Sequence, residues 1–213
     1  MLNLAKLEVG WDKLWTLLPG DLVSVATPES LLSRLIRGMS RREGESPTWA
    51  SHSGVIAEQH GLVIEALWTV KRRSLFDYQG KSQVCVFRAP FVSPGRGLRI
   101  ADAAANRLGQ KYGWWKILQH AHGRAARIAR NDRQICSQLV AECYAEVCYG
   151  FSFGVEPNEA QPDDLLDYAV GNNWLAVWAD SQQTVSELAE IYDAGGNEFA
   201  EELKRRHSKE RAQ

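Results

Sequence analysis

Three side chains that stand far apart in the sequence, Cys136, His52 and Glu65, are of the types that nucleophilic catalysis uses. Cys136 lies in "QICSQLVA" (134–141), which we expect to begin an amphipathic helix. A cysteine in the first turn of a helix lies beside unpaired backbone N–H groups, at the positive end of the helix dipole. Both influences favour the thiolate over the thiol. Cys136 is therefore a candidate nucleophile that needs a base.

His52 is the candidate base, because it lies inside the predicted strand "SHSGVI" (51–56). Side chains alternate along a strand, so His52, Gly54 and Ile56 share one face. The other four histidines stand in less suitable places. They are His60 in a hairpin turn, His120 and His122 in a helix rich in basic residues, and His207 in the charged C-terminal tail.

Glu65 is a candidate because the strand pairing of the hairpin predicted over residues 50–70 places it near His52. With a two-residue loop at Gln59-His60, position 54 pairs with 65 and position 52 with 67. Glu65 then lies diagonal to His52 on the same face. A slip of one residue would move the carboxylate to the opposite face. An unpaired carboxylate in the apolar run "VIEAL" would be costly, and His52 provides it with a partner.

Cys136, His52 and Glu65 are thus a candidate nucleophile, base and orienting group. The alternative is structural: a buried cysteine, a satisfied core histidine and an edge-strand glutamate. A zinc site is disfavoured, because the spacing of Cys136, Cys143 and Cys148 scatters the sulfurs around one helix. We predict free thiols, no metal and no cofactor.

The elements that must position these residues are a sheet and a mostly helical second half. Alternating apolar residues and Gly or Pro breaks predict the strands, and 3.6-residue periodicity predicts the helices. The predicted strands are 19–28, the two arms of the hairpin, 82–90 as a third strand of the same meander, and 174–179. The predicted helices are 28–38, one that begins near Gly97, 111–131, 133–149 and 161–170. The fold class is therefore α+β, an antiparallel sheet or meander packed against helices.

The order of four short motifs resembles a known family. The motifs are "PGDLV" (19–23), "SHSGVI" (51–56), "VIEA" (63–66) and "CSQLV" (136–140). They are similar to the circularly permuted branch of the NlpC-type papain-like cysteine hydrolases, or permuted papain-like amidases, whose layout relatives of lecithin:retinol acyltransferase share. In the usual order the cysteine helix precedes the histidine strand, whereas here it follows. The resemblance spans roughly residues 19–170.

The resemblance implies a permuted papain-like fold with Cys136 as nucleophile, His52 as base and Glu65 as the third polar residue. It also implies a cysteine peptidase or amidase that cleaves an amide bond through an acyl-enzyme, with peptidoglycan stem peptides as the substrate class. Two alternatives remain open. One is a lipid acyltransferase or thioesterase that uses the same three residues, and the other is a non-enzymatic phage or secretion interaction module that retains the fold.

Composition and charge bear on partners and organisation. The 213 residues include 25 basic and 26 acidic side chains, a balance that shows no nucleic-acid footprint. We expect one domain over 1–180 and a charged helical extension over 181–213, solvated or bound to a partner or second subunit. No apolar stretch has the length of a signal peptide or a membrane span, so we expect a cytoplasmic protein, with export or release by another route open.

Overall fold

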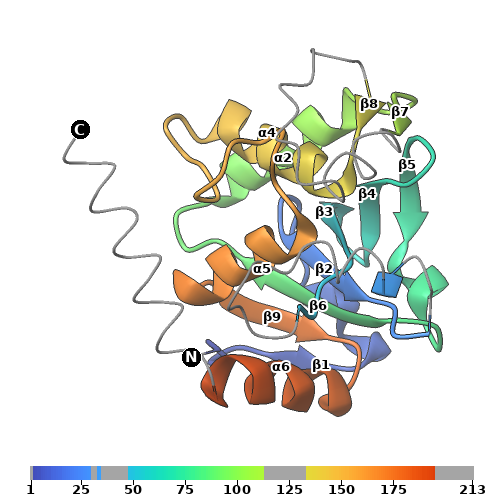
Figure 1. The fold of residues 1–213 in the computed structure, drawn as a ribbon, viewed down its shortest axis with the longest axis vertical. Helices are drawn as coiled ribbons and strands as arrows, with labels where there is room; N and C mark the ends of the chain where they lie inside the picture. The colour runs from blue at the N-terminus through green and yellow to red at the C-terminus, as the bar shows by residue number, and fades with distance from the viewer. Residues whose placement is uncertain (1, 30–32, 35–47, 113–132, 195–213) are drawn as a thin grey trace.

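The computed structural model describes residues 2–29, 33–34, 48–112 and 133–194 (Figure 1). Its centre is a seven-stranded sheet with the order β1-β9-β6-β2-β3-β4-β5. The strands are β1 (Glu8–Val9), β2 (Leu22–Ala26), β3 (His52–Glu58), β4 (Leu62–Ala66), β5 (Val70–Ser74), β6 (Gln83–Arg88) and β9 (Leu175–Ala179). All neighbouring strands are antiparallel except β1 and β9, which are parallel. The predicted α+β class, a sheet packed against helices, is confirmed.

Both faces of the sheet are covered, which explains why β2 is buried at every position. One face packs against four helices, α2 (Pro94–Ala105), α4 (Cys136–Val147), α5 (Pro162–Gly171) and α6 (Gln182–Ala194). The other face packs against two short 3-10 helices, η1 (Trp11–Thr16) and η2 (Leu75–Tyr78). In Figure 1, α2 and α4 lie over the β3 end of the sheet, and α6 lies at the opposite end, near β1 and β9.

The β3–β4 hairpin has the predicted register, with Gly54 opposite Glu65, but a different loop. Glu58 pairs with Leu62, so three residues rather than two form the turn, and a bulge at Ala57 absorbs the extra residue. The turn needs left-handed backbone, with φ of 67° at His60 and 86° at Gly61. The expected pairing of position 52 with 67 is not part of the described ladder. The bulge restores the register, so Glu65 stays on the face of His52.

The strand order differs from the predicted meander in one important respect. The segment 70–74, which we did not predict as a separate strand, forms β5 and pairs with β4. The strand predicted at 82–90 is observed as β6. It lies between β2 and β9 in the strand order, away from β4 and β5. Placing 82–90 directly after the hairpin was therefore wrong. The polar sequence "KRR" of β5 does not show the alternation of apolar and polar residues that predicts a strand. β5 is an edge strand with mostly exposed or half-buried side chains, so it does not need that alternation.

The helical half follows the predictions with shifted bounds. The helix expected over 133–149 begins at Cys136, and Arg133–Gln134 forms a short strand, β8, that pairs with β7 (Lys111–Tyr112). The helices near Gly97 and over 161–170 are observed as α2 and α5. Most of the helix predicted over 28–38, and all but Lys111–Tyr112 of the one over 111–131, lie outside the described residues.

One face of the first part of the C-terminal extension packs on the core. Three apolar side chains of α6, Val185, Leu188 and Tyr192, join the core on the helical face of the sheet, with Leu188 fully buried. Tyr192 Oη also donates a hydrogen bond to Asp167 Oδ1 on α5 (2.6 Å). The expected helix is therefore present as α6, but the expectation that it is solvated or bound to a partner is wrong for the face that packs on this core. Residues 195–213 lie outside the described part of the chain.

Candidate active site

The three predicted site residues come together from three elements. His52 is the first residue of β3, Glu65 lies in β4, and Cys136 is the first residue of α4, which packs on β3. Cys136 is 84 positions from His52 along the chain, yet the two side chains are hydrogen-bonded to each other. The structure thus brings together the residues that the sequence selected.

The start of α4 is built so that its backbone N–H groups are available to the sulfur. Ile135 occupies the N-cap position, and its side chain makes no capping hydrogen bond. The backbone N–H groups of Ser137 and of Ser53 on β3 lie near Cys136 Sγ and lower the pKa of its thiol. Ser137 also fixes the helix start, because its Oγ donates to the carbonyl of Ala160 at 2.5 Å. The sulfur is therefore held among donors at the positive end of a helix.

These surroundings change the acidity of the Cys136 thiol. Burial raises the pKa of the thiol, but the His52 imidazolium, its hydrogen bond and the N–H groups of Ser53 and Ser137 more than offset burial. The net effect is a pKa below the ordinary value of 9.0. Cys136 is only 3% exposed, so the thiolate depends on these neighbours rather than on water. The site favours a thiolate.

His52 lies between two anions. Its Nε2 atom is 2.8 Å from Glu65 Oε2, and the ring also makes a hydrogen bond with Cys136. Because an imidazole has two ring nitrogens and Nε2 is engaged by the carboxylate, Nδ1 is the atom left for the sulfur. Burial lowers the pKa of His52, but the charges of Cys136 and Glu65 outweigh it and raise that pKa to about 10. At neutral pH the ring is an imidazolium that donates to both neighbours.

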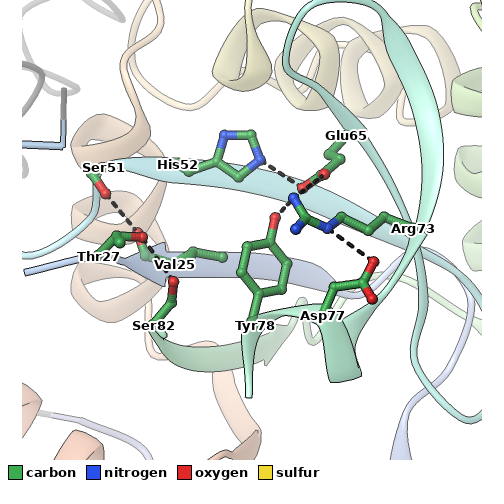
Figure 2. Close-up of polar contacts among 9 residues, drawn as sticks. All are labelled: Val25, Thr27, Ser51, His52, Glu65, Arg73, Asp77, Tyr78 and Ser82. Atoms are coloured by element: carbon green, nitrogen blue, oxygen red, sulfur yellow. Dashed lines mark hydrogen bonds and ion pairs between the residues drawn. The ribbon is translucent and has the colours of Figure 1, made fainter. Parts of the chain in front are cut away.

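Glu65 has more partners than the sequence indicated (Figure 2). Its side chain is 1% exposed. Tyr78 Oη donates to Oε2, the oxygen that also accepts from His52, and Arg73 Nη1 lies 3.4 Å from Oε1. Burial raises the pKa of Glu65, but the positive charge of His52 and hydrogen bonds from His52 and Tyr78 lower it to about 2. Glu65 is therefore a buried carboxylate with both oxygens engaged.

Sequence reasoning missed Arg73 and Tyr78, although the register of β5 provides a signal for one of them. Arg73 pairs with Val63, and Val63 and Glu65 share a face, so Arg73 points to the side of the sheet that holds Glu65. Tyr78 comes from η2, a 3-10 helix capped by Ser74 Oγ, which accepts from the Phe76 N–H (3.2 Å). No periodic pattern marks so short a helix.

The other thiols are in different surroundings. All four cysteines are free. Burial raises the pKa of Cys143 to about 12 and also raises the pKa values of Cys85 and Cys148. Only Cys136 has its pKa lowered. Within the described parts of the chain, no group of three or more His, Cys, Asp or Glu side chains is arranged to hold a metal ion.

Comparisons with known proteins add a limited likeness. No family model matches the sequence, and no curated protein matches it. Among solved structures, the chain is similar to the crystal structure of metalloprotein yiiX from Escherichia coli O157:H7, a DUF1105 protein. The identity is 20%, the TM-score is 0.48, and the match covers 81% of this chain and 93% of that one. Across the described residues, no helix is both long and apolar enough to cross a membrane.

Proposed function

We propose that the protein is a cysteine hydrolase of the permuted papain-like type that cleaves an amide or peptide bond. The observation that carries the proposal is the buried row of interacting side chains Cys136, His52 and Glu65. The Cys136 sulfur lies at a helix start, and the pKa of its thiol is lowered. A structural cysteine needs no such arrangement, since burial alone raises a thiol pKa, as at Cys85. Peptidoglycan stem peptides or related peptides are the proposed substrates, on the sequence resemblance.

The chemistry would follow from the charges already in place. The Cys136 thiolate adds to the scissile carbonyl carbon, and backbone N–H groups at the start of α4 stabilise the oxyanion. His52 Nδ1–H gives its proton to the leaving amine, and the C–N bond breaks to leave a thioester on Cys136. The neutral imidazole then takes a proton from water, which attacks the thioester. The acid product leaves, and the thiolate–imidazolium pair is restored.

Thiol alkylation tests the proposal without a known substrate. Iodoacetamide labelling of the folded protein at mildly acidic pH, read for each cysteine by peptide mass spectrometry, should modify Cys136 and leave Cys85, Cys143 and Cys148 largely unmodified. In His52→Ala the Cys136 rate at that pH should fall by at least about tenfold, because the thiol pKa rises once the imidazolium that lowers it is gone. Equal, slow labelling of all four cysteines would refute a nucleophilic Cys136.

A substrate panel then addresses the reaction. Muropeptides, acyl thioesters and phospholipids are incubated with wild type and with Cys136→Ala, whose melting temperature serves as the folding control. Release of an amine-bearing product from muropeptides, lost in Cys136→Ala, is the expected result. Turnover of only the thioester or lipid substrates would contradict amide hydrolysis and favour acyl transfer to or from lipid.

A further inference from the structure

Two residues besides His52 hold the Glu65 carboxylate, namely Tyr78 and Arg73. Glu65 Oε2 accepts from both His52 Nε2 and Tyr78 Oη, so one oxygen links the base to a phenol from a separate element, η2. Arg73 approaches the other oxygen, Oε1, at 3.4 Å. A carboxylate that is held at both oxygens cannot rotate freely, and its direction sets the direction of the imidazole.

Arg73 is itself held in place by two further contacts. Its Nε donates to Asp77 Oδ2 at 3.1 Å, and its guanidinium carbon lies 4.8 Å from the centre of the Tyr78 ring. Asp77 and Tyr78 belong to the same 3-10 helix, and Arg73 to the strand just before it. The segment 73–78 is therefore one local unit that presents a phenol and a guanidinium to Glu65 (Figure 2).

We propose that Tyr78 and Arg73 are positioning residues, which keep Glu65 ionised and aimed at His52 so that the Cys136–His52 pair stays charged. The inference deepens the proposed hydrolase function and rests on it. The hydrogen bonds of Tyr78 and Arg73 toward the site go to Glu65, so these two residues act through Glu65 and His52. The surroundings of Glu65 explain the need for such support, because an anion that is 1% exposed has little stabilisation from water.

The titratable and charged groups around Glu65 come from four elements. These are His52 on β3, Cys136 on α4 behind the imidazole, Tyr78 on η2, and Arg73 and the exposed Lys71 on β5, of which Lys71 is the register partner of Glu65. Loss of the phenol hydroxyl removes a hydrogen bond to the charged form. Glu65 then protonates at higher pH, His52 loses one of its two anions, and the Cys136 thiolate loses stabilisation.

The test is the pH dependence of Cys136 alkylation in Tyr78→Phe and Arg73→Gln. The loss of a hydrogen bond to a charged group is expected to shift the titration by about one to two pH units. The acid limb is the pH range over which the alkylation rate of Cys136 rises to its neutral plateau. In Tyr78→Phe we expect this limb to lie about one pH unit higher than in the wild type. The rate on the plateau should stay within about threefold of wild type. Arg73→Gln should move the limb in the same direction by less, because Arg73 is 26% exposed and its contact is longer. Arg73→Lys should recover part of that shift.

Two matched controls separate positioning from structural damage. Tyr144→Phe also removes a buried phenol hydroxyl, but one that donates to the Gly20 carbonyl (2.6 Å). Arg72→Gln removes the same charge as Arg73→Gln from the neighbouring position of β5, whose side chain is exposed and on the opposite face. Neither control should shift the acid limb. If Tyr78→Phe melts too low to measure, Arg73→Gln against Arg72→Gln decides alone.

The outcomes separate this proposal from the proposed function. A selective Cys136 in wild type, together with acid limbs in Tyr78→Phe and Arg73→Gln that match their controls, would overturn the positioning role and leave the hydrolase standing. A lower melting temperature without any shift in the limb would overturn it in the same way. Wild-type Cys136 that labels no faster than Cys85 would overturn both.

Discussion

At the scale of single residues, His52 stabilises the site because its imidazolium lies between two buried anions, Cys136 and Glu65. Cys136 and Glu65 each favour the imidazolium, and the imidazolium favours both of their charged forms. The charges are mutually dependent, so the removal of one leaves the others with an uncompensated burial cost. Variants at these positions should therefore differ in their pH dependence as well as in their rates.

The Glu65 carboxylate predicts a specific stability profile. Its pKa is lowered from an ordinary 4.5 to about 2, so its contribution is complete above pH 4.5 and is lost as the pH falls through 2. The shift corresponds to a contribution on the order of 3 kcal/mol. We expect the free energy of unfolding of the wild type, measured with urea, to fall over this range, and Glu65→Gln to lack that part of the fall. Parallel curves for the two proteins would show that another carboxylate controls acid unfolding.

The opposite sign applies to His52. Its pKa is raised from 6.5 to about 10, so its contribution is complete below pH 6.5 and is lost as the pH rises through 10. Because the pKa of Cys136 is lowered and that of His52 is raised, the Cys136 thiolate and the His52 imidazolium both persist across neutral pH. The alkylation profile should accordingly have a plateau rather than a single sigmoid.

At the scale of elements, a backbone contact fixes α2 against the turn that precedes β2. A Cβ built on Gly97 would lie 2.2 Å from the Pro19 carbonyl oxygen, and one built on Gly20 would lie 2.5 Å from Gly97 Cα. Gly20 also has a φ of 86°, which disfavours other residues. The next residue, Asp21, is buried and accepts two hydrogen bonds from Arg88. The "PGD" turn is thus an anchor of the fold rather than a part of the site.

This contact predicts a contrast between two glycines of one helix. Gly97→Ala should lower the free energy of unfolding by about 3 kcal/mol, since the new methyl group meets backbone that cannot move aside. Gly95→Ala, two positions earlier and with nothing within 4 Å of its Cβ, should change it by zero to about 1 kcal/mol in the stabilising direction. Chemical denaturation measures both. Equal effects would mean that α2 shifts readily relative to the turn.

The same scale shows what the sequence can and cannot predict. The pairing of Gly54 with Glu65 was predictable, because alternation and the cost of a buried charge constrain the register more strongly than the loop does. The two-residue loop was wrong, and the bulge at Ala57 compensates for it. The support of Glu65 was not predictable, because Arg73 lies on a polar edge strand and Tyr78 on a single turn of 3-10 helix. The roles of Cys136, His52 and Glu65 in catalysis stay predictions.

At the scale of the whole molecule, the described part of the chain shares its core from β1 to α6. The core on the helical face includes both Leu2 near the N-terminus and Leu188 in α6, together with residues of the strands β3 and β4 that carry the site. A core that is continuous in this way is typical of a single cooperative unit. The site and the C-terminal helix should therefore unfold together.

Leu188→Ala tests this cooperativity. Truncation of a fully buried leucine costs about 2–5 kcal/mol, and Glu190→Ala, at an exposed position of the same helix, should cost less than about 0.5 kcal/mol. We expect Leu188→Ala to melt in one transition at lower temperature, and selective labelling of Cys136 to disappear in that same transition. Loss of helical circular dichroism at a temperature where Cys136 remains selective would show that α6 is a separate unit.

The parallel pairing of β1 with β9 sets the order in which the molecule can be completed during its synthesis. Trp178 Nε1 donates to the Gly10 carbonyl across 168 positions of sequence, and Gly10 N–H donates to the Ala179 carbonyl. At about 5–20 residues per second, the ribosome needs on the order of ten seconds or more to supply β9 after β1 has been made. β1 is made before the other described strands, yet it cannot form its parallel pairing until β9 has been translated.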